Sequence, residues 1–157
     1  MMLYEPKYDS SFETYQHKER VQTYILAIMD SLAQRGLTHD QSKLESPEKE
    51  IFDEYSPKLK ELQYGTTEYF DTLKKMQVAL DHHYGVNNHH PEHFENGIRG
   101  MTLIDIIEMF CDWMAACERT KNGNILDSLE TNQSRFNFSD DLKSIFINTV
   151  HELQQEK

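Results

Sequence analysis

The sequence has few of the features that mark secreted, membrane-spanning or nucleic-acid-binding chains. Only two of its 157 residues are cysteine, Cys111 and Cys117, and both fall within one apolar helical pattern. So few cysteines exclude a disulfide framework and a zinc ribbon, and we expect reduced intracellular thiols. No apolar run approaches the roughly 18 residues that a membrane-spanning helix needs. The start, MMLYEPKYDS, has neither a basic region nor an apolar run, so we expect no signal peptide and a cytoplasmic protein.

Basic charge is also scarce. The formal net charge is −11, from 16 Lys and Arg against 27 Asp and Glu. An extended nucleic-acid surface needs a basic footprint, and we expect neither such a surface nor a membrane partner. A small phosphorylated substrate stays compatible with this charge, because a bound cation reverses the local field. The sequence does not determine the oligomeric state, and a homo-oligomer is compatible with it.

Alternation typical of β-strands is nearly absent, whereas apolar residues recur at helical spacing along the whole chain. The length fits one domain, and residues 1–157 are expected to form a single compact all-α domain with its core at about 12–150. Five to seven helices are predicted, at about 11–35, 47–57 with a continuation through KLKELQ, 66–85, 102–119, 125–136 and 140–155. Gly36 is expected to end the first helix.

Histidine and aspartate residues are concentrated in a few short stretches, which suggests a metal site. The candidate ligands are His17, His39, Asp40, His82, His83, His89, His90 and Asp112. Neutral imidazoles with carboxylates suit one or two ions of Mn, Zn, Fe, Ni or Co. The Asp40 carboxylate, which has two oxygens, can bridge a second ion, and two ions roughly 3.5–4 Å apart would clamp a phosphoryl group.

The segment HHYGVNNHHPEH, residues 82–93, holds five of the eight histidines. Two histidine pairs so close together are not expected by chance, and a surface metal-binding tract without function is the alternative explanation. Pro91 disfavours helix at the residue before it, so His89 and His90 are expected in a loop or at a helix start. Which histidine of each pair is a ligand is left open. Glu92 and His93 are candidates for orienting the imidazoles.

The predicted helix at 102–119 carries Asp105, Glu108 and Asp112 on one stripe and apolar side chains on almost every other side. A helix so apolar should be largely buried. A buried carboxylate needs a partner, and a cation would supply one. Exposure to water is an equal alternative for Asp105 and Glu108, whereas Asp112 is predicted to be a ligand.

The order His17, then His39-Asp40, then further histidines, then Asp112 on a helix resembles the HD-domain metal-dependent phosphohydrolase superfamily. HDQSK is similar to the HDxGK of its cyclic-dinucleotide-cleaving branch, with Ser42 in place of glycine and no GYP segment. HDQSK, HHYGVNNHHPEHF and LIDIIEMFCDWMAACER together resemble a small bacterial and phage HD-like family, over about residues 12–150.

This resemblance implies hydrolysis of a phosphomonoester or phosphodiester, in a nucleotide or another small phosphorylated substrate. Lys43 or Arg20 would steady a phosphate oxygen, and Glu92 or Glu108 would move a proton. The superfamily also contains di-iron oxygenases with the same ligand order, so the ligands alone do not determine the reaction. A non-catalytic module that binds a nucleotide or a protein is the second alternative.

Overall fold

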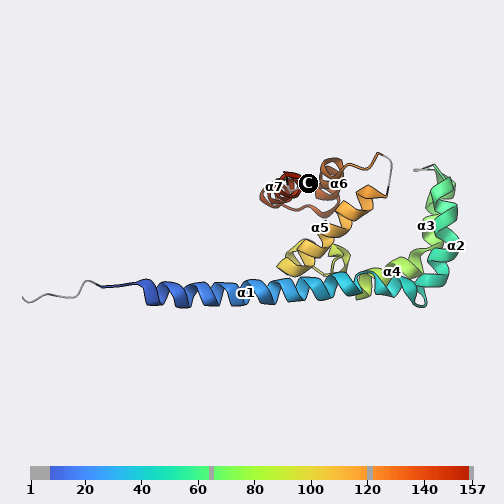
Figure 1. The fold of residues 1–157 in the computed structure, drawn as a ribbon. Coiled ribbons are helices and arrows are strands. Elements are labelled where there is room, and N and C mark those ends of the chain that lie inside the picture. The colour runs from blue at the N-terminus through green and yellow to red at the C-terminus, as the bar shows by residue number, and fades with distance from the viewer. Residues whose placement is uncertain (1–7, 64–65, 120–121, 156–157) are drawn as a thin grey trace, which may run out of the picture. The chain divides into compact units, whose positions relative to one another are not determined.

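The computed structural model describes residues 8–63, 66–119 and 122–155 and contains only helices within them (Figure 1). The all-α prediction is confirmed. The elements are α1 (Ser11–Thr38), η1 (Gln41–Leu44), α2 (Glu48–Glu61), α3 (Thr67–Lys75), α4 (Gln77–Val86), η2 (Pro91–His93), η3 (Gly97–Gly100), α5 (Leu103–Glu118), α6 (Ile125–Phe136) and α7 (Asp140–Gln155), where η denotes a 3-10 helix. The chain divides into two compact units, residues 1–37 and 38–157. The expectation of a single domain stays a prediction.

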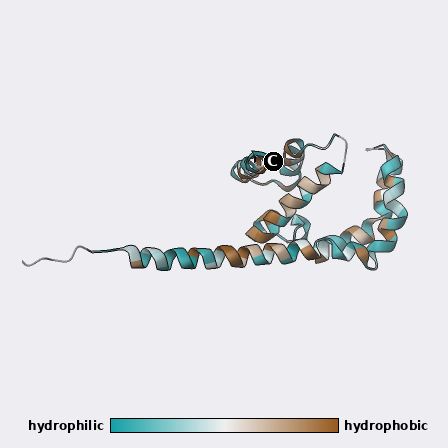
Figure 2. Cartoon of the chain, in the orientation of Figure 1, coloured by the Kyte–Doolittle hydropathy of each residue, from teal (hydrophilic) through white to brown (hydrophobic). Residues whose placement is uncertain are grey.

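The first unit consists of α1 up to Leu37. The helix does not end at Gly36, as the sequence suggested, but continues to Thr38. Its apolar stripe is visible as a hydrophobic stretch in Figure 2, and side chains such as Tyr24, Ile25 and Met29 are exposed. No helix within the described residues combines the length and hydropathy that crossing a membrane requires.

The second unit begins with a group of packed helices, in which α2 contacts η1, α3 and α4. The helix α2 passes through Pro57 to Glu61, so it includes the first four residues of the expected continuation KLKELQ. The predicted helix at 66–85 is two helices, which are separated at Met76. Met76 and Ala79 are buried where α4 begins, one turn before the histidine segment.

The remaining helices, α5 to α7, enclose an aromatic core in which Phe110 and Phe146 stack at 4.7 Å between ring centroids. Met109 and Leu129 are almost fully buried beside them. The Thr102 side chain and Asp105 form a capping box that begins α5. This core holds α5 in place, and α5 carries Glu108 and Asp112 toward the histidines.

Candidate metal centre

The turn between α1 and η1 presents His39 and Asp40. Asp40 has a positive φ of 56°, in the left-handed region that aspartate tolerates better than most residues. The two residues therefore do not follow one helix, on which their side chains would diverge by about 100°. His39 approaches Glu108 of α5, and Asp40 approaches His83 and His89. A sharp turn at Asp40 thus brings these two neighbours into one cluster.

Of the pair in α4, His83 is the buried member, at 2% exposure, whereas the His82 side chain is 39% exposed. His83 lies seven residues after Met76 and four after Ala79, so all three occupy the buried face of the helix segment. The His83 Nε2 atom lies 2.9 Å from His90 Nε2 and 3.3 Å from Asp40 Oδ1. The structure therefore favours His83 over His82 as a ligand.

The loop after α4 supplies His89 and His90. Pro91 begins η2, so both histidines precede a helix, as predicted. His89 is 2% exposed, and its Nε2 atom lies 3.4 Å from Asp40 Oδ1. Its ring centroid is 4.1 Å from that of His90. Both members of this pair thus belong to the cluster.

The helix α5 completes the cluster with two carboxylates. Glu108 Oε1 accepts from His39 Nδ1 at 2.9 Å and lies 3.2 Å from His89 Nδ1. Asp112 Oδ1 is 3.6 Å from His39 Nε2. Asp105 and Glu108 are buried, which excludes the alternative that these two residues face water. Glu108 binds the nitrogen atoms on the far side of both rings from Asp40, and so orients both imidazoles.

These side chains form three groups that could hold a metal ion. The groups are Asp40, His83, His89 and His90; His39, His89 and Glu108; and His39, Asp40 and Asp112. Ligand atoms at about 2.1 Å from one ion lie roughly 3.0–3.4 Å apart, close to the separations seen in the first group. Asp40 belongs to two groups, with Oδ1 beside His83 and His89 and Oδ2 at 3.6 Å from His39 Nε2.

Two atoms of the first group, Asp40 Oδ1 and His89 Nε2, are buried without a hydrogen-bond partner among the described residues. They lie 3.4 Å apart but lack the alignment of a hydrogen bond. Buried polar atoms nearly always have a partner, because an unpaired one costs roughly 1–3 kcal/mol. A cation between them would satisfy both, so the donor set fits a metal ion.

Burial and interactions within the cluster shift the pKa values of several of its residues. Interactions with Asp112 and then Glu108 raise the pKa of His39 to about 10. Burial and then the nearby His89 and His83 lower the pKa of His90 to about 3. Burial opposes ionisation of Asp40, but interactions with His83, His89 and Lys43 outweigh it and lower its pKa. Without an ion, the carboxylates therefore retain protons on His39 that a metal would displace.

Lys43 lies within this centre as well. Its Nζ atom donates to Asp40 Oδ2 at 2.6 Å, across one turn of η1. The ammonium thus neutralises the oxygen of Asp40 that faces the third group. Lys43 is therefore in position to contact a ligand bound beside Asp40 Oδ2.

The other predicted site residues lie outside these three groups. His17 and Arg20 are exposed on α1 in the first unit, where Arg20 donates to the Tyr24 hydroxyl. Glu92 forms an ion pair with Arg135 at 2.5 Å. His82 Nδ1 lies 2.7 Å from Glu48 Oε1. Their predicted roles as ligands or catalytic groups stay predictions.

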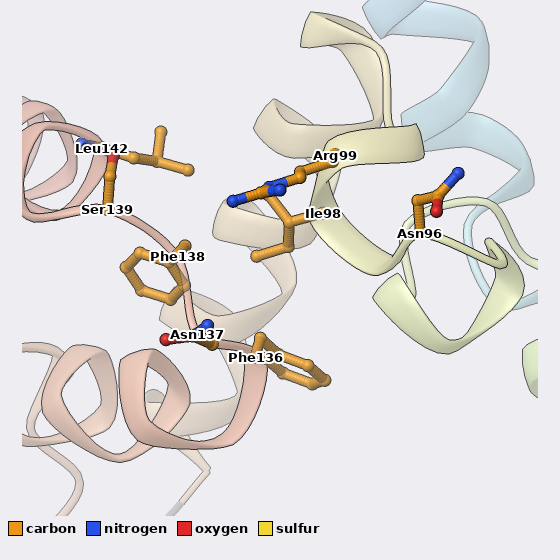
Figure 3. Close-up of a pocket in the computed structure, with 8 residues that line it drawn as sticks. All are labelled: Asn96, Ile98, Arg99, Phe136, Asn137, Phe138, Ser139 and Leu142. Atoms are coloured by element: carbon orange, nitrogen blue, oxygen red, sulfur yellow. Dashed lines mark hydrogen bonds between the residues drawn. The ribbon is translucent and has the colours of Figure 1, made fainter.

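A separate hollow of about 670 Å³ lies between η3 and the turn that joins α6 to α7. Figure 3 shows Arg99 reaching into it from one side, with Phe138 and Leu142 on the other. None of its lining residues belongs to the three candidate metal groups.

The fold and the cluster define an all-helical protein with a histidine- and carboxylate-rich candidate metal centre. The chain belongs to a family described as a family of unknown function, DUF5662, whose model matches residues 7–152. No curated protein and no solved structure matches the sequence. The resemblance to the HD-domain superfamily therefore depends on the motifs quoted above.

Proposed function

We propose that the protein is a metal-dependent phosphohydrolase that cleaves a phosphomonoester or phosphodiester bond in a nucleotide or another small phosphorylated substrate. The observation that carries the proposal is the convergence of Asp40 Oδ1 and His89 Nε2 with His83 and His90; both atoms are buried and have no hydrogen-bond partner among the described residues. Such an arrangement is costly unless a cation occupies it.

A centre of two ions accounts for the group composition. The first group would hold one ion through His83, His89 and His90, and the third would hold another through His39 and Asp112. Asp40 would bridge them, one oxygen to each. Two ions bound in this way would polarise a phosphoryl group and activate water for in-line attack.

Protein side chains would supply the remaining functions. Lys43 Nζ, which binds Asp40 Oδ2 in this structure, would be released when a cation takes that oxygen, and could then bind a phosphate oxygen. Glu108 would hold the Nε2 atoms of His39 and His89 toward the ions. We assign Glu108 this orienting role in preference to proton transfer.

The departure from HDxGK at Ser42 has a structural explanation that is compatible with the proposal. Ser42 Oγ accepts a hydrogen bond from Asn87 Nδ2 at 2.8 Å. Asn87 follows α4 directly, so this bond ties η1 to the end of the helix that carries His83. A glycine at this position would lack the bond, and here the serine contributes to positioning Asp40 against His83.

The test is elemental analysis of protein purified without chelator or nickel resin, followed by a hydrolysis screen. One to two equivalents of Mn, Zn, Fe, Ni or Co are expected. The screen would use p-nitrophenyl phosphate, its bis ester and a panel of nucleotides, with Asp40→Asn as the matched inactive control. The expected result is release of phosphate or nitrophenol by the wild type alone.

Three outcomes would contradict the proposal. Failure to bind any of these ions, even after they are added back, would leave a helical binding module. Two equivalents of iron with substrate-dependent oxygen uptake and no hydrolysis would favour an oxygenase. Tight nucleotide binding without turnover by the metal-loaded protein would favour a non-catalytic binding role.

A further inference from the structure

Glu48 is a fully buried carboxylate beside the candidate metal centre. It begins α2 and has an exposure of 0%. An acidic residue in the first turn ordinarily stabilises a helix from the solvent side, which does not require burial. The Glu48 carboxylate instead meets two imidazoles, with Oε1 at 2.7 Å from His82 Nδ1 and Oε2 at 2.9 Å from His83 Nδ1.

We propose that Glu48 is a positioning residue that holds His83 in the tautomer and ring orientation in which Nε2 is free to bind a metal ion. The inference rests on the proposed metal centre. A carboxylate only accepts hydrogen bonds, so the imidazole nitrogen that it contacts must carry the proton. In a neutral ring, the other nitrogen then has the lone pair.

Two other side chains contact His83 Nδ1, and both lie farther from it than Glu48 Oε2 at 2.9 Å. Ser42 Oγ is 3.3 Å away, and a hydroxyl oxygen can accept from Nδ1–H as the carboxylate does. Asn87 Nδ2 lies 3.0 Å from the same nitrogen, but the two hydrogens of this amide already bind Ser42 Oγ and the His83 carbonyl oxygen, each at 2.8 Å. Asn87 therefore has no hydrogen left for His83 Nδ1. Glu48 is the nearest acceptor, and His83 Nε2 is left to face Asp40 Oδ1 and His90 Nε2.

The same geometry gives His82 a function without making it a ligand. His82 Nδ1 donates to Glu48 Oε1, so the second oxygen, Oε2, accepts from His83 Nδ1. The adjacent histidines thus divide the work, with His82 orienting the carboxylate and His83 facing the candidate ion. Glu108 contacts His39 Nδ1 and His89 Nδ1 in the same manner. Two buried carboxylates would then set the orientation of three ligand imidazoles.

The first measurement is the tautomer of His83 in the metal-free protein near pH 8, read from imidazole 15N–1H correlation spectra and assigned with a His83→Gln variant. The wild type should show a proton on Nδ1 and none on Nε2. In Glu48→Ala this single form should give way to a mixture or to the opposite tautomer. A wild type without the Nδ1–H form, or an unchanged form in Glu48→Ala, would overturn the proposal.

The second measurement is metal affinity by competition with a chromophoric chelator. Loss of a partner that orients a ligand typically weakens binding by roughly 10–100-fold. Glu48→Ala should lose this much at the group that contains His83, while binding at His39, Asp40 and Asp112 is retained. Glu48→Gln keeps one acceptor oxygen and the side-chain volume, so it should be partly rescued, and it replaces Glu48→Ala if that variant does not fold.

His82→Ala is the matched control, because it removes the other partner of Glu48. Its loss of affinity should be below about 10-fold, the lower limit for an orienting partner. A larger loss than in Glu48→Ala would make His82 the ligand and refute the division of roles. If the wild type binds no metal, the proposed function fails, yet the tautomer measurement still decides the role of Glu48.

Discussion

The shared position of Asp40 leads to a graded prediction for three single substitutions. Asp40 belongs to two candidate groups, whereas His90 and Asp112 belong to one each. Asp40→Asn should therefore weaken both ions, and His90→Ala or Asp112→Asn should weaken only one. Asparagine is the appropriate replacement at residue 40, because it keeps the volume and also tolerates the φ of 56°.

The size of the effect follows from mass action. An ion at 100 times its dissociation constant stabilises the folded protein by about 2.7 kcal/mol, so two independent sites contribute about 5.4 kcal/mol. A 100-fold loss of affinity at one site reduces its contribution to about 0.4 kcal/mol at the same metal concentration. The expected gains on adding metal are thus about 5.4 kcal/mol for the wild type, 3.1 for His90→Ala and Asp112→Asn, and 0.8 for Asp40→Asn.

The assay is chemical denaturation of each variant with chelator and with metal, together with the number of ions bound at equilibrium. The chelated samples serve as the baseline, because each substitution also changes the stability of the metal-free fold. Equal gains for all three variants, or full stoichiometry in Asp40→Asn, would refute a bridging role for this carboxylate. Loss of both ions in Asp112→Asn would refute two separable groups.

Four further predictions concern charge, pH and packing. Lys43→Gln should tighten metal binding several-fold, because the Lys43 ammonium competes with a cation for Asp40 Oδ2. The same substitution should weaken inhibition by inorganic phosphate. Chelator competition and inhibition assays would measure the two effects, and unchanged values would contradict the competition. Since the pKa of His39 is raised to about 10, metal binding near pH 7–8 should release about one proton per centre, which calorimetry in two buffers of different ionisation enthalpy would count, and affinity should rise with pH. The metal-free protein should be most stable near pH 6.5. The contribution of His39 to the free energy of unfolding is fully present below about pH 6.5 and is lost as pH rises toward 10, because its pKa is raised. The pKa of His90 is lowered, so its protonation destabilises the fold as pH falls from about 6.5 toward 3. Urea denaturation of the chelated protein across this range would test both directions, and His90→Ala should flatten the acid side. Leu129→Ala should cost about 2–5 kcal/mol in urea denaturation, because its side chain is fully buried in the core that holds α5, and a cost below 1 kcal/mol would contradict that packing.

The sequence predicted helices well where local signals and packing agree, as in α6 and α7. The bounds of these two helices match the prediction, and Ser139 Oγ accepts from Leu142 N at the start of α7 as expected for a cap. The break at Met76 could not be predicted, because the apolar stripe continues through both α3 and α4. The continuation of α2 past Pro57 was left open by the sequence, and it occurs because one missing N–H does not end a helix that packs against its neighbours.

The site was predictable to the extent that ligand chemistry limits residue type. His39, Asp40, His89, His90 and Asp112 were expected together and occur in the candidate groups. The sequence spacing indicates His83 rather than His82 as the buried histidine. Met76, Ala79 and His83 are three and four residues apart, so they share one face of the helix, and this face is buried. Glu48 carried no such signal. An acid in a first turn is usual for any helix, and only the fold shows that this one is buried against two imidazoles.

Glu48, which sequence analysis missed, gives the pair His82 and His83 two different roles in this proposal. A ligand needs its far nitrogen held by a partner, and a buried carboxylate that performs this task needs its own second oxygen satisfied. Glu48 meets both conditions by binding His82 and His83, and Glu108 meets them by binding His39 and His89. In this proposal His82 would orient the carboxylate that orients the ligand His83, so one histidine of the segment would bind no ion. Counting histidines would then overestimate the ligands, and the hydrogen-bond partners of each Nδ1 would separate the two roles.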